Sequence, residues 1–450
     1  MLRYLVLLVW LTDRAIGQET TFQLPSTPPS IQTQQLQIPL AQAQAPAQPS
    51  NIYSTEVGQI IQDSMACFTV TTASKIMKSK DMEEDKNIFF SPLDLYTATA
   101  LTYLGSDGEA RRRLGNILGI KEPRPNVHSR RRRQQPRSLE DIYRTIGALV
   151  NQSKDSNLAA IQYGAGVYVY NDYAIKSTYI EDARNYFGIE VKCTDFKAQN
   201  VASTELINND IAKATNQRIV KFFLEPVSPD TQLVVPSTLS FVAKWQNLFN
   251  PDDTYETAFR TREDGCDDTN ICLMMNLQTI PYFKDTENNL EAIGIPFSDP
   301  NLFLYFVIPT KLIYLKHVVE HPNKNVLQKI VESAQPQKVR YHVPKMILEA
   351  HIDEMQLFKQ TGINNLTQNE IADSLTLTNL EQVVEIELNE EGVGGCMVEE
   401  SKKSPSVQNV NDPQAIEFIV DKPYIFFIYH KAAKTFLFYG VIFKPLGYEN

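Results

Sequence analysis

The 450-residue sequence contains no long hydrophobic run and little tryptophan or histidine. A membrane-spanning helix needs about 20 apolar residues in a row, and no stretch of this chain reaches that length. The six histidines are scattered, and no metalloprotease helix, nucleophile elbow or phosphate-binding loop occurs. The sequence therefore gives no support to a membrane protein, a metal site, a bound cofactor or an enzyme.

Basic residues are also fewer than acidic ones: the chain has 43 Lys and Arg residues and 53 Asp and Glu residues, which gives a net charge of −10. The overall field therefore does not favour nucleic acid or an anionic membrane as a partner. Hydrophobic residues make up 43% of the chain and aromatic residues 10%, enough for a substantial core. No linker interrupts the pattern after residue 52, so we expect one soluble, monomeric domain over 53–450.

The first 52 residues differ in composition from the rest of the chain. Residues 1–17 combine Arg3, a short apolar run and a small-residue cleavage site, which is typical of a secretory signal peptide. Residues 18–52 are rich in Gln and Pro and cannot bury enough apolar surface to offset the entropy of ordering. We therefore expect a disordered arm and a secreted, extracellular protein.

Export would expose the five cysteines to oxidation, and their odd number leaves at least one thiol without an intramolecular partner. Cys266 and Cys272 flank a short, mostly polar stretch, so a local disulfide and two free thiols are both open interpretations. Asn151 and Asn365 each begin an Asn-X-Ser/Thr sequon, which predicts a glycoprotein if the chain is exported.

Apolar periodicity predicts helices mainly in the first half and strands mainly after residue 301. Helices are expected over 57–73, 95–104, 111–118, 139–150 and 175–187. Strands are expected over 87–92, 164–170, 233–241, 302–309 and 383–388, with a final hairpin of 424–429 and 436–443. This pattern is typical of an α+β architecture with several sheets.

A polar segment with two adjacent glycines and two prolines lies between the strand ending at Leu388 and the final hairpin. Its composition predicts an exposed loop. Loops of this length in compact domains are usually functional, although an insertion without a role is the alternative.

Separated motifs around this loop resemble the serpin family. The resemblance is carried by Asn87–Pro92 with Leu104-Gly105, by Leu388–Gly392, by Asp421–Tyr424 with Phe438–Gly440, and by Lys244-Trp245 and Val343–Lys345. It covers the chain from about residue 53 to the C-terminus. It implies the serpin fold, with three β-sheets, about eight or nine helices and an exposed reactive-centre loop at about 390–417.

In serpins a protease cleaves this loop, whose N-terminal part then inserts as a new central strand of the main sheet. The resemblance therefore implies a hinge of Glu390, Glu391, Gly392, Val393, Gly394 and Gly395. Counting from the hinge as in the family, the resemblance implies a reactive bond at Ser406–Val407. Lys403–Ser404 is the alternative, because a basic side chain suits a trypsin-like pocket.

Insertion would turn alternate loop residues toward the core. The family alignment puts Val393, Gly395, Met397, Glu399, Ser401 and Lys403 on this inward set. Burying the charges of Glu399 and Lys403 would cost free energy. In serpins one region of the main sheet opens to admit the loop. The resemblance places Ser91, Asp94, Ser237, Gln382 and Trp245 in this region.

The expected function is suicide inhibition of an extracellular trypsin-like serine protease, in an arthropod-type innate-immunity setting. The alternative is a non-inhibitory serpin that acts as a protease substrate, carrier or binding protein. Two basic clusters could bind a sulfated polysaccharide such as a glycosaminoglycan, or could simply be solvated loops. Their residues are Arg111, Arg112, Arg113, Arg130, Arg131, Arg132 and Arg133.

Overall fold

The computed structural model describes residues 56–79, 86–120, 139–261, 270–363, 366–394, 405–408, 410 and 412–444. Residues 51–450 form one compact unit. The expected signal peptide and arm, Arg130–Arg133, Cys266, Asn365, and the loop residues from Gly395 to Ser404 lie outside the described residues.

The described residues contain nine α-helices, and within them no helix is long and apolar enough to span a bilayer. A short strand ends at Phe90, and the helix α2 begins directly after it. The helix starts there because the Ser91 hydroxyl accepts from the Asp94 N–H and Pro92 occupies the first helical position. The helices are α1 (Glu56–Met77), α2 (Pro92–Gly105), α3 (Gly108–Ile117), α4 (Leu139–Lys154), α5 (Ser177–Asp182), α6 (Asn200–Ala214), α7 (Leu312–Glu320), α8 (Lys324–Ser333) and α9 (Glu354–Lys359).

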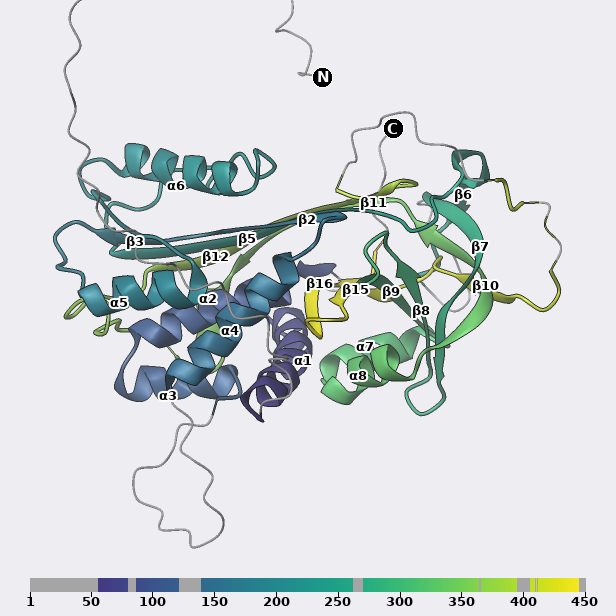
Figure 1. The fold of residues 1–450 in the computed structure, drawn as a ribbon, viewed down its shortest axis with the longest axis horizontal. Coiled ribbons are helices and arrows are strands. Elements are labelled where there is room, and N and C mark those ends of the chain that lie inside the picture. The colour runs from purple at the N-terminus through teal and green to yellow at the C-terminus, as the bar shows by residue number, and fades with distance from the viewer. Residues whose placement is uncertain are drawn as a thin grey trace, which may run out of the picture. The chain divides into compact units, whose positions relative to one another are not determined.

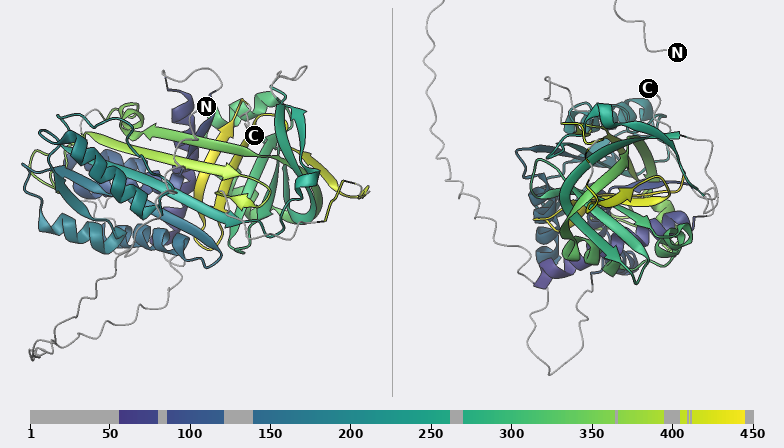
Figure 2. Two further views of the ribbon diagram at one scale, coloured as in Figure 1. Left: turned by 90° about the horizontal axis from the view of Figure 1, so that it is seen from above. Right: turned by 90° about the vertical axis from the view of Figure 1, so that its right-hand side faces the viewer.

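A seven-stranded main sheet lies between α6 on one face and α2, α4 and α5 on the other (Figure 1). Its order is β11 (Met346–Asp353), β12 (Asn379–Leu388), β13 (Gly392–Val393), β5 (Leu233–Lys244), β3 (Val167–Tyr170) and β4 (Val191–Thr194), with β2 (Ala159–Ala165) paired to β5. Long strands run side by side through this sheet when it is seen from above (Figure 2).

A second network joins nine strands, and its central members are buried along their whole length because both faces are covered. Its order is β1 (Ile88–Phe90), β16 (Thr435–Ile442), β15 (Tyr424–His430), β9 (Leu302–Pro309), β8 (Leu290–Pro296), β7 (Asn270–Asp285), β10 (Gln335–Pro344) and β14 (Ile416–Ile419), with β6 (Tyr255–Ala258) paired to β7.

The expected α+β fold with several sheets is confirmed. The resemblance implies three β-sheets, whereas the strands of the described residues form two continuous networks, because the long β7 pairs with β10 over most of its length and with β8 at Tyr282–Asp285. The expected helix over 175–187 is α5 followed by a π-helical turn at Ala183–Phe187.

Cys272, one of the two residues of the disulfide left open by the sequence, carries a free thiol, and Cys266 lies outside the described residues. Cys272 lies on β7 opposite Glu256 of β6, and its neighbours Ile271 and Leu273 also pair with β6. Strand pairing therefore fixes the backbone at this position.

Candidate functional site

The start of the hinge forms a short strand within the main sheet. Gly392 and Val393 form β13, and they lie opposite Lys244 and Ala243 of β5, respectively. Val393 also lies opposite Leu388 of β12. The Val393 side chain is fully buried. The hinge therefore already occupies the gap between β5 and β12 at one end of the sheet.

At the other end of the sheet, β5 and β12 pair directly with each other. Residues 379–382 of β12 pair in parallel with 234–237 of β5, and the Thr238 hydroxyl donates to the Val383 carbonyl at 2.5 Å. A longer insertion of the loop would have to separate these pairs.

Two hinge glycines are required by the close approach of neighbouring backbone. A Cβ on Gly392 would lie 2.0 Å from the Ala243 carbonyl oxygen, and one on Gly394 would lie 2.3 Å from that of Phe241. Gly394 also has a φ of +88°, which side chains disfavour. Its carbonyl accepts a hydrogen bond from the Arg218 guanidinium at 2.5 Å.

The turn that precedes β13 is anchored to the body of the molecule. Glu390 makes a largely buried ion pair with Lys345 at 3.0 Å and accepts from the Thr254 hydroxyl at 2.9 Å. The Trp245 indole N–H donates to the Asn389 carbonyl at 2.8 Å. Trp245, which the sequence grouped with the sheet-opening residues, thus lies at the hinge end of β5.

The other four sheet-opening residues come together beneath the closed pairs of β5 and β12. The Gln382 side chain donates to an Asp94 carboxylate oxygen at 2.5 Å and to the Ser91 carbonyl at 3.1 Å, and it accepts from the Ser91 N–H at 2.9 Å. The Ser237 hydroxyl faces the Asp94 carboxyl closely enough to lower its pKa, outside regular hydrogen-bond geometry.

Burial dominates the ionisation of this cluster. It raises the pKa of Asp94 from 3.8 to about 7, against the lowering effect of Gln382, Ser237 and Tyr163. Glu354 of α9 is also fully buried, and burial together with repulsion from Asp94 raises its pKa well above the usual value. Glu354 accepts from the Thr99 hydroxyl at 3.2 Å. Two acidic groups therefore lie under the part of the sheet that must open.

The residues of the expected reactive bond are found against the body. Ser406 and Val407 both contact Asp253, in the short 3₁₀ turn Pro251–Asp253. Lys403 and Ser404 lie outside the described residues.

The first basic cluster is engaged with its own surroundings. Arg112 and Arg113 pair with Glu109 on α3, and Arg113 also donates to the Gly362 carbonyl at 2.6 Å. Arg111 donates to the Tyr143 hydroxyl at 3.2 Å. Asn151 is exposed near the end of α4.

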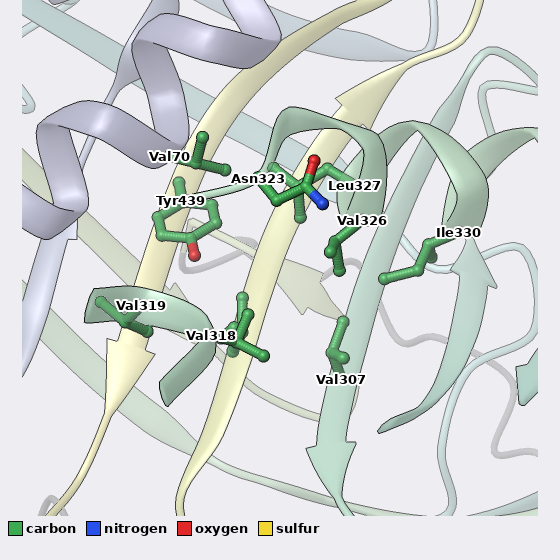
Figure 3. Close-up of a pocket in the computed structure, with 10 residues that line it drawn as sticks. Val70, Val307, Val318, Val319, Asn323, Val326, Leu327, Ile330 and Tyr439 are labelled. Atoms are coloured by element: carbon green, nitrogen blue, oxygen red, sulfur yellow. The ribbon is translucent and has the colours of Figure 1, made fainter. Parts of the chain in front are cut away.

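An apolar pocket lies between α1, α7, α8 and strands β9, β15 and β16 (Figure 3). Among its ten lining residues only Asn323 and Tyr439 carry polar side-chain atoms, and its free volume is about 10 Å³. This is room for about one water molecule and is far below the size of small-molecule sites. The lining residues are Val70, Val307, Val318, Val319, Asn323, Val326, Leu327, Ile330, Ile425 and Tyr439.

The hinge residues Gly392 and Val393 thus lie between β5 and β12, which pair directly with each other further along the sheet. The sequence profile of the family described as serpin (serine protease inhibitor) matches residues 64–445. The chain is a serpin. The family in general inhibits proteases rather than catalysing reactions, and its partners are proteases.

Relatives of this serpin match it over most of its length at low identity. Serpin B10 of Rhinolophus ferrumequinum is 24% identical and covers 82% of this chain and 96% of its own length. Ovalbumin-related protein Y of Gallus gallus is 24% identical, covering 84% of this chain and 97% of its own. These vertebrate relatives do not support the arthropod-type placement expected from the sequence.

Solved structures share the fold. Human thyroxine-binding globulin, in complex with thyroxine, superposes with a TM-score of 0.73 at 19% identity and covers 88% of this chain and 100% of its own. Serpin48 of the insect Tenebrio molitor gives 0.69 at 19% identity, covering 86% of this serpin and 98% of its own chain.

Proposed function

We propose that this serpin is a secreted, monomeric suicide-substrate inhibitor of an extracellular trypsin-like serine protease. The observation that carries the proposal is β13, because a hinge strand already seated between β5 and β12 only has to grow in order to insert. Gly392 and Gly394 make this seat possible, since a side chain on either would collide with β5.

The chemistry belongs to the protease. Its serine oxygen bonds to the carbonyl carbon of the residue before the scissile bond, the C–N bond breaks, and the released amine takes up a proton. This chain needs only to supply the peptide bond and then to insert before water hydrolyses the ester.

The observed register defines what insertion would bury. Continuing the pairs of Val393 with Ala243 and Leu388 places Gly395 opposite Phe241 and Ile386. Four residues further along, Glu399 reaches Ser237 and Gln382, directly above Asp94. Because cross-strand partners share a face of the sheet, the buried Ser237 and Gln382 place Glu399 on the core side.

The test is incubation of the full chain with trypsin-like proteases, followed by denaturing electrophoresis. An inhibitor is expected to yield an SDS-resistant complex whose mass equals the protease plus the N-terminal fragment of the cleaved serpin, with the C-terminal fragment released. A catalytic-serine variant of the same protease is the control, because it cannot form the ester and should give no complex. Cleavage without any complex would contradict inhibition.

That contrary outcome would favour a non-inhibitory substrate, carrier or binding protein as the second candidate. The charges of Glu399 and Lys403 at inward positions favour this alternative, because each must lose its hydration during insertion. Binding of a sulfated polysaccharide and glycosylation at Asn151 and Asn365 stay predictions.

A further inference from the structure

The C-terminal part of the reactive-centre loop is bound to the body of the molecule at the expected reactive bond itself. Asp253 is fully buried. One of its carboxylate oxygens accepts the Ser406 hydroxyl at 2.5 Å, and the other accepts the Val407 N–H at 2.7 Å. Hydrogen bonds to a carboxylate are stronger than those between neutral groups, so Asp253 grips both sides of the Ser406–Val407 bond.

Arg340 of β10 binds the backbone carbonyl groups of the same segment. Its guanidinium donates to the Val407 carbonyl at 3.1 Å and also to the Val410 carbonyl. The Val410 N–H in turn donates to the Val407 carbonyl at 3.2 Å. Val407 therefore has its N–H and its C=O both bound, and the chain after it turns back rather than running extended.

A bond held in this way cannot be cleaved as it stands. A serine protease must take the side chain before the scissile bond into its specificity pocket and the carbonyl into its oxyanion hole, and it must protonate the nitrogen that leaves. Here the Ser406 side chain is bound to Asp253, and the leaving nitrogen, that of Val407, donates to the same carboxylate.

We infer that Asp253 and Arg340 form a latch that withholds the Ser406–Val407 bond from proteases, so that this bond is cleaved only after the segment is released from the body. The latch deepens the proposed function, on which it rests, by making Asp253 and Arg340 determinants of where the loop is cut. It favours cleavage at bonds outside the latched segment, such as Lys403–Ser404.

The test compares cleavage rates at two positions in the full-length protein. An elastase-type protease, whose pocket takes small side chains, probes Ser406–Val407, and trypsin probes Lys402 and Lys403. Mass spectrometry identifies the C-terminal fragment that begins at Val407. Asp253→Asn removes the negative charge and leaves one acceptor oxygen for two donors, the Ser406 hydroxyl and the Val407 N–H. A lost charge-assisted hydrogen bond corresponds to about a 10-fold change in rate.

We expect Asp253→Asn and Arg340→Gln each to speed cleavage at Ser406–Val407 by about 10-fold, with trypsin cleavage changed by less than about 2-fold. Asp252→Asn is the matched control, because the Asp252 backbone carbonyl that accepts from Gln408 at 3.0 Å is retained. Arg340→Gln carries the test if Asp253→Asn does not fold.

An unchanged rate at Ser406–Val407 in a folded variant would overturn the latch. The proposed inhibitory function is judged separately, by the SDS-resistant complex. A latch without a complex, or a complex without a latch, would each be recognised.

Discussion

Asp94 is the buried acidic residue whose ionisation should be visible in the stability of the protein. Its pKa is about 7 in the folded chain against 3.8 ordinarily, so the folded state holds this proton where the unfolded chain has released it. The free energy of unfolding should therefore fall as pH rises from about 4 to about 7, by roughly 4 kcal/mol in total.

Asp94→Asn should remove this dependence and leave the variant more stable than the parent above pH 7. Thermal or urea unfolding at pH 5, 6, 7 and 8 measures it, with Asp230→Asn, an exposed site, as the matched control. Glu354 contributes in the same direction, so a residual slope is expected in Asp94→Asn and should disappear with Glu354→Gln added. Parallel curves for parent and Asp94→Asn would show that Asp94 ionises normally.

Single residues of the site were predictable only where a motif carried them. Ser91 and Asp94 lie in or beside a motif that resembles the family, whereas Glu354 reaches the same cluster from a short helix distant in sequence. Asp253 gave no signal, because Pro251-Asp252-Asp253 looks like an ordinary surface turn. Its role depends on where the returning loop passes, which no local pattern encodes.

At the scale of elements, the strand that would insert contains a matched pair of acidic residues. If the register of β13 continued on insertion, Glu399 would face the core next to Asp94 and Glu400 would face the opposite side of the sheet. Burying Glu399 beside a second acid costs several kcal/mol. Glu399→Ala should therefore raise the ratio of SDS-resistant complex to cleaved serpin several-fold, and Glu400→Ala should change it little.

The same register makes trapping dependent on pH, because protonated carboxyl groups are cheaper to bury. The ratio of complex to cleaved product should be higher at pH 6 than at pH 8 in the parent, measured with a protease active at both. This difference should shrink in Glu399→Ala. Equal effects of the alanine substitutions at 399 and 400 would show that the inserted register is not the one continued from Val393.

Elements were predictable where both faces of a strand are buried. The runs at 302–309 and 424–429 stand out because every residue is apolar, and β9 and β15 lie there. The helix α6 was not predicted, since its sequence is largely polar and it covers the sheet with few buried residues. The two residues of β13 have no compositional signature, because only the gap between β5 and β12 makes them a strand.

At the scale of the whole molecule, the ordered motifs were enough to predict the fold. The division of the strands between sheets was not predictable, because it depends on β7 pairing with both β10 and β8. Insertion would convert a main sheet that is joined directly at 379–382 and 234–237 into one with a full additional strand. The intact chain should thus be the less stable of its two forms.

Cleavage by the target protease should therefore raise the melting temperature. About ten newly paired residues gain hydrogen bonds on both sides, each worth about 1 kcal/mol net, less those lost where β5 and β12 separate. A gain on the order of 10 kcal/mol corresponds to a rise of at least about 10 °C for a chain of this size. Calorimetry of intact and cleaved protein measures it, with Val393→Arg as the control, since a charge at that buried position should block insertion and abolish the rise. A cleaved parent that melts no later than the intact protein would mean that the sheet does not accept the loop.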